Sequence, residues 1–247
     1  MENILKQSSV FNDRLETLKK NNNEKDFSWY PYGTMSNIHI LETLLSNGFE
    51  NLIERNNYLP IADIGSADGD LAFFLEFLGY SCEVIDHPPT NWNGMKGVRY
   101  LKELLRSSIM IHDINLDDMN CLPKKKYGLV ILLGILYHLK NPYGVLENLS
   151  RCSKEIIIST RIARYTKEDS SYCIMDKSFV YLLDADECNN DSTNYWIFTE
   201  ASLKKILRRT GWKLVSYKSF GDTKKSNPSD SHRDERIFLH AQSKLFP

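Results

Sequence analysis

The sequence predicts an α/β fold with a mostly parallel sheet and helices on both faces. Five short, mainly apolar runs, at 61–64, 82–86, 109–113, 127–133 and 155–160, alternate with segments of helical periodicity. The run at 127–133 is apolar throughout, which is typical of a strand buried on both faces. Strands and helices in this rhythm indicate parallel strands joined by right-handed crossovers.

Length and composition favour one domain and exclude several classes of protein. The chain has 247 residues, 42% hydrophobic, with a net charge of -1, so a surface that binds nucleic acid over its whole extent is not expected. Its five cysteines are widely spaced without a C-x-x-C pair, which argues against a disulfide scaffold or a zinc cluster. We find no secretory signal and no membrane-spanning run, and therefore expect a cytoplasmic protein.

The segments on either side of this core predict its other elements. Residues 1–26 predict a short helix followed by a loop. The aromatic run 27–33 contains Pro and Gly, which excludes a regular helix there. Apolar residues recur at helical spacing over 38–45 and predict a second helix. Near the end, 200–209 form a helix with Thr199 as N-cap, and 212–217 and 236–241 form a closing strand pair. We expect a cap at 1–60, a cofactor-binding core at 61–160, a lid insertion at 161–199 and a closing segment at 200–247.

A glycine-rich loop after the first strand points to a cofactor. Asp63, Gly65 and Gly69 give the spacing Asp-x-Gly-x-x-x-Gly, followed at once by a helical pattern. A strand, a tight loop and a helix form a common cofactor-binding unit, but this spacing is not the dinucleotide fingerprint. The carboxylate of Asp63 would repel a pyrophosphate, so the motif favours S-adenosylmethionine over NAD.

Three acidic residues stand at the ends of three successive strands: Asp63, Asp86 and Asp113. In an open α/β sheet these ends line one crevice. Asp86 follows Gly65 at about the distance at which an acid reaches a ribose diol, and Asp113 is suited to accept a hydrogen bond from an adenine amine.

These motifs resemble the class I S-adenosylmethionine-dependent methyltransferases from Ile61 to Thr160, with the closing strand pair extending the match. The resemblance implies a Rossmann-like domain with a seven-stranded sheet whose last strand is antiparallel. It also implies that Asp63, Gly65 and Gly69 contact the methionine moiety, Asp86 the ribose and Asp113 the adenine. Ser66, Leu133 and Tyr30 complete our expected cofactor-binding set.

A narrower resemblance, to the tRNA wobble-uridine carboxymethyltransferase-like family, lies at Leu133–Pro142 and at Trp29-Tyr30-Pro31. In that family the tyrosine matching Tyr137 helps to read the substituent on the sulfonium of the cofactor. Only 60 residues precede the first strand, fewer than in the tRNA enzymes, and no basic surface for RNA is obvious. We therefore expect ordinary S-adenosylmethionine and a small substrate, with the carboxylated cofactor and tRNA as the alternative.

Candidate catalytic residues follow the fourth and fifth strands. His138 is our candidate general base, with an orienting histidine as the alternative, and Tyr137 is suited to contact the acceptor or the sulfonium. Arg161 is a third catalytic candidate, and together with Arg164, after the fifth strand, it is suited to bind an anionic substrate. An ordinary solvated pair is the alternative. Tyr165, Tyr195 and Trp196 complete the expected substrate residues. Four acids, Asp184, Asp186, Glu187 and Asp191, lack metal-site spacing, and we expect no metal.

Taken together, the sequence predicts a methyltransferase that modifies an O or N atom of a small polar or anionic metabolite, such as a sugar or a natural-product intermediate. A wobble-uridine-type enzyme is the first alternative. A non-catalytic interaction subunit with the same fold is an alternative of another class, and an NAD-dependent oxidoreductase ranks last. No membrane partner is expected, and the sequence leaves the oligomeric state open.

Overall fold

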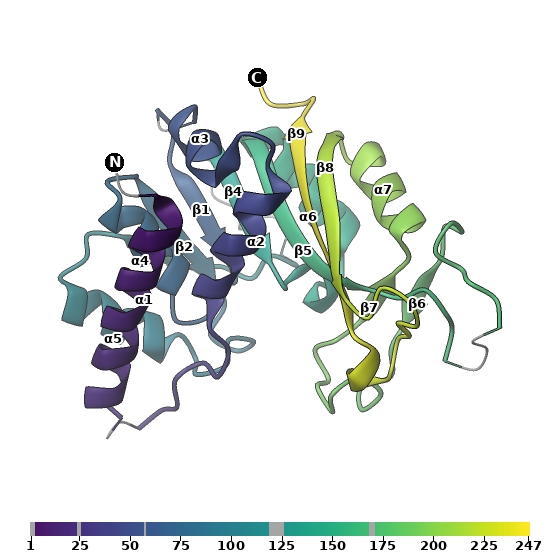
Figure 1. The fold of residues 1–247 in the computed structure, drawn as a ribbon, viewed down its shortest axis with the longest axis horizontal. Helices are drawn as coiled ribbons and strands as arrows, with labels where there is room; N and C mark the ends of the chain where they lie inside the picture. Colours follow the sequence, from purple (N-terminus) through teal and green to yellow (C-terminus); the bar gives the residue numbers. More distant parts are fainter. Residues whose placement is uncertain (1–2, 24–25, 57, 119–125, 168–170) are drawn as a thin grey trace. The chain divides into compact units, whose positions relative to one another are not determined.

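The structure is a computed structural model that describes all residues except 1–2, 24–25, 57, 119–125 and 168–170. The chain divides into two compact units, one formed by residues 1–115 and 126–131, the other by 116–125 and 132–247 (Figure 1). Each unit is described by itself below.

The first unit contains a parallel sheet with the strand order β3-β2-β1-β4. Strands β1 and β2 pair in parallel with Ile61 opposite Cys82, and β2 and β3 pair in parallel with Asp86 opposite Asp113. The strands are β1 (Ile61–Ile64), β2 (Cys82–Asp86), β3 (Met110–Asp113) and β4 (Tyr127–Leu133), the last two residues of which belong to the second unit. All four confirm runs that the sequence predicts.

The helices of the first unit bury apolar stripes. Asn3 caps the first helix by accepting a hydrogen bond from the Leu5 amide, and Phe11 on its buried face lies 5.6 Å from Phe74, measured between ring centroids. The helices are α1 (Ile4–Asn21), the short η1 (Thr34–Ser36), α2 (Asn37–Leu44), α3 (Gly48–Glu54), α4 (Asp70–Phe77) and α5 (Lys96–Leu105).

Helix α5 begins in the amide-rich segment 91–97, whose asparagine side chains cap it. The Asn91 side-chain oxygen accepts from the amide of Met95 at 2.8 Å, and that of Asn93 accepts from the amide of Gly97 at 3.1 Å. These bonds satisfy amides that the first turn of a helix leaves without intrahelical partners. The segment is therefore the beginning of a helix as well as a loop.

The second unit is built on antiparallel and parallel strands around β5. Strand β5 pairs in parallel with β7 and antiparallel with β9, β9 also pairs with β8, and β7 pairs antiparallel with β6. The strands are β5 (Ser153–Ile162), β6 (Val180–Leu182), β7 (Trp196–Phe198), β8 (Trp212–Gly221) and β9 (Glu235–Ser243).

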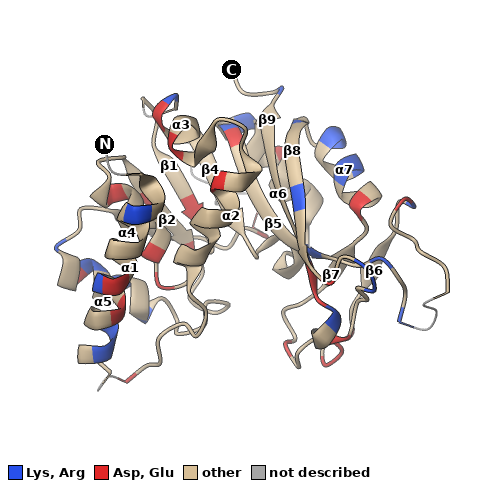
Figure 2. Cartoon of the chain, in the orientation of Figure 1, with Lys and Arg blue, Asp and Glu red and all other residues tan. Residues whose placement is uncertain are grey.

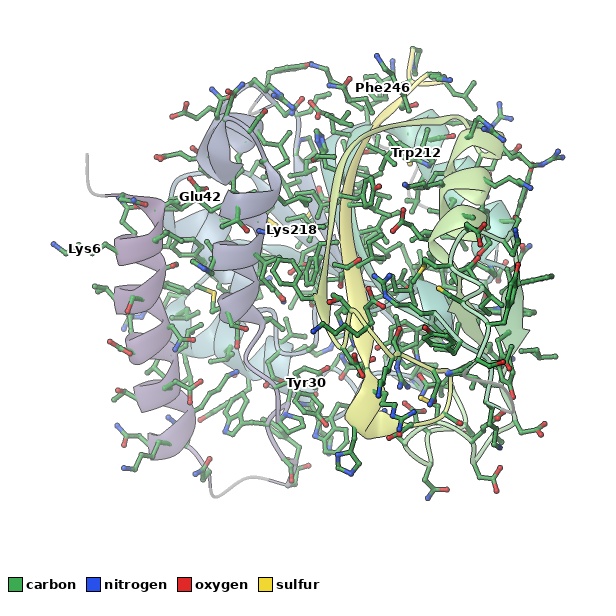
Figure 3. All side chains as sticks on the ribbon, turned by 45° about the vertical axis from the view of Figure 1, so that its right-hand side comes forward. Lys6, Tyr30, Glu42, Trp212, Lys218 and Phe246 are labelled. Carbon is green, nitrogen blue, oxygen red and sulfur yellow. The ribbon has the colours of Figure 1, made fainter. Side chains whose placement is uncertain are left out.

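Each long helix of the second unit starts at a side-chain cap. Asn141 accepts from the Gly144 amide ahead of α6, and Thr199 forms a capping box with Ser202 at the start of α7. Trp212, at the start of β8 (Figure 3), is buried and donates from its ring nitrogen to the Leu146 carbonyl at 2.9 Å. The helices are η2 (Leu136–His138), α6 (Pro142–Cys152), α7 (Glu200–Arg209) and η3 (Ser231–Arg233).

The predicted fold class, an α/β domain with a mostly parallel sheet and an antiparallel last strand, is confirmed. Within the described residues there are nine strands rather than seven, because β6 and β7 form within the expected insertion at 161–199. The division into cap, core, lid and closing segment stays a prediction. In the part of the chain that is described, no helix combines the length and apolarity needed to cross a membrane.

Candidate functional site

The loop between β1 and α4 is shaped by residues with positive φ. Gly65 has φ +68° and Gly69 has φ +83°, and the Gly69 amide donates to the Ser66 carbonyl at 2.8 Å. At Gly69 a Cβ atom would lie 2.7 Å from Val98 and 2.9 Å from the Phe73 ring, so both backbone conformation and packing require glycine there. The loop is a tight turn that connects the end of β1 to the start of α4.

Asp63 at the end of β1 has an unpaired buried oxygen. Its Oδ2 atom and the hydroxyl of Ser66 are both buried and make no hydrogen bond within the described residues. Burial first, and then the neighbouring Asp86 carboxylate, raises the pKa of Asp63 to about 7. A buried carboxyl group and a buried hydroxyl, both with unpaired oxygens near the end of β1, fit a cationic ligand that also carries hydrogen-bond donors, such as the methionine end of S-adenosylmethionine.

Asp86 and Asp113 follow at the ends of β2 and β3. Asp86 accepts from the His87 amide at 2.8 Å and from the Asn91 side chain at 2.9 Å; burial raises its pKa and these hydrogen bonds oppose the shift. Each carboxylate oxygen has two lone pairs, so Asp86 keeps capacity for a ribose hydroxyl. Asp113 is half exposed, and its carboxylate lies 3.3 Å from His87 Nδ1. The expected ribose and adenine residues therefore stand on adjacent strands.

Asp68 contacts three separate segments of the first unit and was not among the predicted site residues. Its carboxylate accepts from the backbone amide of Tyr30 at 2.8 Å and from the Asn93 side chain at 2.8 Å, and it lies 3.3 Å from Lys19 Nζ. Lys19 also donates to Asp70 at 2.8 Å. Helix α1, the aromatic segment and the start of α5 thus all hold the glycine-rich loop. The available signal was its position, because Asp68 stands directly before Gly69 in the glycine-rich loop.

Tyr30, an expected cofactor residue, lies in the aromatic segment after α1 (Figure 3). It lines a surface hollow of about 370 Å³ together with Trp29, Tyr32 and Lys19. Its ring centroid is 5.5 Å from that of Tyr32. The structure therefore attaches Tyr30 to the glycine-rich loop through its backbone and leaves its ring at the surface of the first unit.

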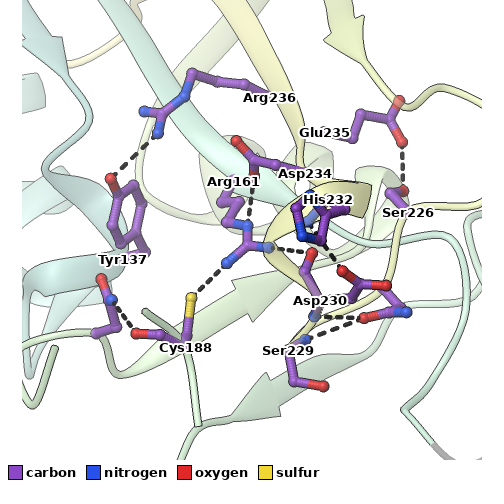
Figure 4. A network of polar contacts seen from close by, with 12 residues as sticks. Tyr137, Arg161, Cys188, Ser226, Ser229, Asp230, His232, Asp234, Glu235 and Arg236 are labelled. Carbon is purple, nitrogen blue, oxygen red and sulfur yellow. Dashed lines mark hydrogen bonds and ion pairs between the residues drawn. The ribbon is translucent and has the colours of Figure 1, made fainter. Parts of the chain in front are cut away.

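In the second unit, Tyr137 and His138 lie in η2, just after β4. Leu133 ends the strand, and Gly134, with φ +77°, turns the chain at a place where a Cβ atom would approach Arg236 Nη1 to 3.2 Å. Arg236 donates to the Tyr137 hydroxyl at 3.3 Å, with its guanidinium 5.6 Å from the ring centroid (Figure 4). Sequence reasoning missed Arg236, because it follows Tyr137 by almost 100 positions.

His138 is held by the insertion. Its Nδ1 atom lies 2.9 Å from the Thr193 hydroxyl and 3.1 Å from the Thr193 carbonyl oxygen. Burial lowers its pKa, and the positive charge of Arg236 adds to this, whereas Asp191 and the hydrogen bond to Thr193 oppose the shift. The imidazole is therefore neutral at pH 7, as a general base must be.

Two of the expected substrate residues lie against η2. The Tyr195 amide donates to the Tyr137 carbonyl at 2.9 Å, and the Trp196 ring nitrogen donates to the Leu139 carbonyl at 2.8 Å. The structure thus brings these aromatic residues of the insertion together with the candidate catalytic pair.

Arg161, near the end of β5, and Arg164, just after the strand, both contact the segment 226–235. Figure 4 shows the contacts of Arg161. Arg161 is buried, forms an ion pair with Asp234, donates to the Cys188 sulfur and donates to the Asp230 carbonyl at 3.2 Å. Both of these guanidinium groups have partners within the protein, which points to a positioning role for each. A direct role in catalysis or substrate binding stays a prediction.

Arg164 and Tyr165 meet the same segment. Arg164 binds the buried Glu235 through two hydrogen bonds of 2.6 and 2.8 Å, and Ser226 donates to the same carboxylate at 2.6 Å. The Tyr165 amide donates to the Ser226 carbonyl at 3.1 Å. Of the expected substrate residues, these two therefore lie at the 226–235 segment, whereas Tyr195 and Trp196 lie at η2.

The acidic residues of the insertion serve separate contacts. Glu187 accepts from the Tyr181 hydroxyl at 2.8 Å and pairs with Lys167 at 3.1 Å, whereas Asp191 accepts from Thr193. Among the described residues no group of three or more His, Cys, Asp or Glu side chains is arranged to hold a metal ion.

Comparison with protein families identifies the chain. Residues 16–217 match the family model described as "Methyltransferase domain". The chain belongs to this methyltransferase family. The expected enzyme class, a methyltransferase that uses S-adenosylmethionine, is thereby confirmed, and the loop, the unpaired Asp63 oxygen and the Asp86 carboxylate fit that cofactor. No curated protein matches the chain significantly.

Solved structures share the fold. The N-terminal domain of EvdMO1, crystallised with SAH and D-fucose, has a TM-score of 0.59 and 13% identity, over 94% of this chain and 97% of that one. A putative methyltransferase from Bacillus halodurans C-125 has a TM-score of 0.53 and 13% identity, over 78% and 97%. The [4+2]-cyclase SpnF has a TM-score of 0.55 and 10% identity, over 78% and 79%. At these identities the likeness concerns the fold alone.

Proposed function

We propose that this methyltransferase transfers a methyl group to an O or N atom of a small polar or anionic metabolite, such as a sugar or a natural-product intermediate. The observation that carries the proposal is the cluster at η2, where Tyr137 and His138 meet Tyr195, Trp196 and Arg236. It combines aromatic surface, a neutral imidazole and a fixed positive charge. Aromatic rings stack on sugars, and arginine binds carboxylates and phosphates.

The cofactor half of the proposal rests on the first unit. Asp63 and Ser66 would hold the methionine end, and Asp86 the ribose hydroxyls, consistent with their unpaired or partly paired oxygens. When bound, S-adenosylmethionine supplies an activated methyl group on a sulfonium ion. The protein's own contribution is then to position the acceptor and to remove its proton. Because EvdMO1, which shares the fold, was crystallised in the presence of D-fucose, sugars are the first acceptors to test.

Calorimetry with SAH tests the cofactor half. Asp86→Asn should weaken SAH binding about 10- to 100-fold, because it removes a charged acceptor of hydroxyl hydrogen bonds worth about 1.5–3 kcal/mol. Asp13→Asn, on the exposed face of α1, is the matched control and should bind SAH as the wild type does. A wild-type protein that does not bind SAH would refute the proposal and favour the non-catalytic interaction subunit.

SAH release tests the acceptor. Purified protein is incubated with S-adenosylmethionine and a panel of hexoses, deoxyhexoses and sugar acids, and SAH is quantified by mass spectrometry. We expect release above background with at least one member of the panel, and Tyr195→Ala should reduce it. Turnover of a panel member without SAH release would contradict methyl transfer.

One observation favours the wobble-uridine alternative. Arg236 lies 3.3 Å from the hydroxyl of Tyr137, the tyrosine that in the resembling family reads the substituent on the sulfonium. A cation at this point would suit a carboxylated cofactor. Helix α7 adds a basic face, with Lys204, Lys205, Arg208 and Arg209 (Figure 2). The sequence also has a run of three lysines at 124–126, most of which lies outside the described residues.

Native mass spectrometry distinguishes the two candidates. A carboxylated cofactor copurifying with the protein, together with tRNA binding that weakens steeply with salt, would support the wobble-uridine type. Copurified SAH or S-adenosylmethionine and no tRNA binding would favour the small-molecule enzyme.

A further inference from the structure

The hydrogen bonds of His138 define which of its ring nitrogens carries the proton. Nδ1 lies 3.1 Å from the carbonyl oxygen of Thr193 and 2.9 Å from its hydroxyl oxygen. A carbonyl oxygen only accepts hydrogen bonds, so Nδ1 must be the donor. In the neutral imidazole the other nitrogen, Nε2, then carries a lone pair.

Thr193 is itself hydrogen-bonded to Asp191. The Thr193 hydroxyl donates to Asp191 Oδ1 at 2.6 Å, and the Thr193 amide donates to the same oxygen at 2.9 Å. Because the hydroxyl proton is used on Asp191, the hydroxyl oxygen presents a lone pair to His138. The three side chains form one directed chain in which each group donates to the next, from His138 through Thr193 to Asp191.

The outer nitrogen of His138 has no such partner. Within the described part of the chain, Nε2 makes no hydrogen bond. The charged groups that act on the ring are Asp191, which favours its protonated form, and Arg236, which disfavours it. The Tyr137 ring lies beside the imidazole, with 4.2 Å between the centroids. Nε2 is therefore a basic atom with its tautomer fixed and its lone pair unused.

We propose that Thr193 and Asp191 are positioning residues that hold His138 as the Nδ1–H tautomer, so that Nε2 takes the proton from a hydroxyl group of the acceptor. This rests on the proposed function and narrows it to acceptors with an alcohol or phenol group. A carboxylate acceptor is already ionised at neutral pH and would need no base.

The electron and proton balance of the step is simple. An oxygen lone pair of the acceptor forms the new O–C bond while the S–C bond of the donor breaks, and that electron pair stays on sulfur. The O–H proton moves to Nε2, which leaves a protonated His138. Its positive charge is then stabilised through Thr193 by Asp191, in the manner of the acid that orients the histidine in a catalytic triad.

The tautomer is measured directly by long-range ¹H–¹⁵N NMR of the imidazole rings, in the full-length protein with and without SAH. The His138 signals are assigned by their loss in His138→Gln. We expect the neutral ring to be protonated at Nδ1. A neutral ring protonated mainly at Nε2 would overturn the inference, because Nε2 could not then accept a proton.

The same spectra test the chain to Asp191. Asp191→Asn should lower the pKa of His138 by about 0.5–2 units, the effect of one charge at about 5 Å between water-like and protein-like screening. Asp186→Asn, an exposed acid of the same insertion, is the matched control and should leave that pKa unchanged. Equal pKa values in the wild type and Asp191→Asn would overturn the role of Asp191.

Activity measurements separate this inference from the proposed function. With a hydroxyl acceptor found in the SAH-release panel, the nearly isosteric Thr193→Val should lower kcat about 10-fold or more, leave the KM for S-adenosylmethionine unchanged and shift the pH profile of kcat. Cofactor binding with an unchanged kcat would overturn the role of Thr193 alone. A protein that binds neither SAH nor S-adenosylmethionine would overturn both the proposed function and the base.

Discussion

Replacing Lys19 by methionine should destabilise the protein strongly, although Lys19 lies outside every expected site. Its ammonium group is 2.8 Å from Asp70 and 3.3 Å from Asp68, and only about a tenth of its side chain is exposed. Burial lowers the pKa of Lys19, but the two carboxylates outweigh this, so its pKa is raised overall. Lys19 is therefore charged at neutral pH and compensates two buried acids.

The expected loss of stability comes from the carboxylates of Asp68 and Asp70, which the variant leaves without a compensating positive charge. Removing one partner from a buried ion pair costs about 3–5 kcal/mol, because the remaining charge loses its compensation. Methionine keeps most of the apolar contact of the lysine stem, and water reaches part of this site. We therefore expect a loss near the lower end, about 3 kcal/mol, and a fall in Tm of about 6–12 °C for a protein of this size.

Urea denaturation and thermal melting measure this loss. Lys20→Met, the exposed neighbour on α1, is the control and should change the free energy of unfolding by less than about 0.5 kcal/mol. In Lys19→Met with Asp70→Asn, the second substitution removes one uncompensated charge, so the double variant should recover much of the loss. A double variant no more stable than the single one would show that charge compensation is not the cause.

The pH dependence gives a second test with a defined sign. Burial raises the pKa of Asp70 and Lys19 partly offsets this, so loss of Lys19 raises that pKa further. A carboxyl group with a raised pKa in the folded state destabilises the protein increasingly as pH rises above its unfolded value. The deficit of Lys19→Met should therefore grow from pH 4.5 to pH 8. A deficit that is constant or shrinks over this range, or one below about 1 kcal/mol throughout, would refute the reasoning.

Three further predictions concern single sites. Because the pKa of Asp63 is about 7, SAH affinity should rise between pH 6 and pH 8 in the wild type, and calorimetry should find no such rise in Asp63→Asn. Thr199→Ala should lower the free energy of unfolding by about 1–2 kcal/mol through loss of the α7 cap, as measured in urea. Arg164→Met should cost about 3 kcal/mol or more, because the buried Glu235 loses its ion-pair partner and keeps only the hydrogen bond from Ser226. Glu235→Gln in the same chain should restore part of this loss, and an unchanged melting curve for Arg164→Met would contradict the prediction.

The parts of the fold predicted from sequence are those set by local pattern. The runs that form β1, β2, β4 and β5 are apolar and rich in residues that favour strands, so both the strands and their burial could be predicted. Once the strands were placed, the acids at their ends could be placed as well. A helix between β2 and β3 was expected, but the start of α5 was not, because it is made by side-chain caps from Asn91 and Asn93 rather than by an apolar period.

Most of the candidate site was predicted from residues that are close in sequence to a motif, apart from Tyr195 and Trp196 of the insertion. His138 and Tyr137 follow β4 directly, so their position could be inferred. Their partners Arg236 and Thr193 arrive from β9 and from the insertion, far along the chain, and no local pattern marks them. Likewise, no sequence pattern near Arg161 predicts its ion pair with Asp234.

The position of β9 has a consequence for how the protein is made. Residues 235–243 form the strand that pairs with both β5 and β8, and among the described strands β8 pairs with no other. During synthesis, β5 therefore exposes an unpaired, largely apolar edge until residues 235–243 have been translated. Unpaired edges of this kind recruit chaperones or other chains. In the second unit, β9 therefore covers the edge of β5 through which the sheet could otherwise pair with other chains.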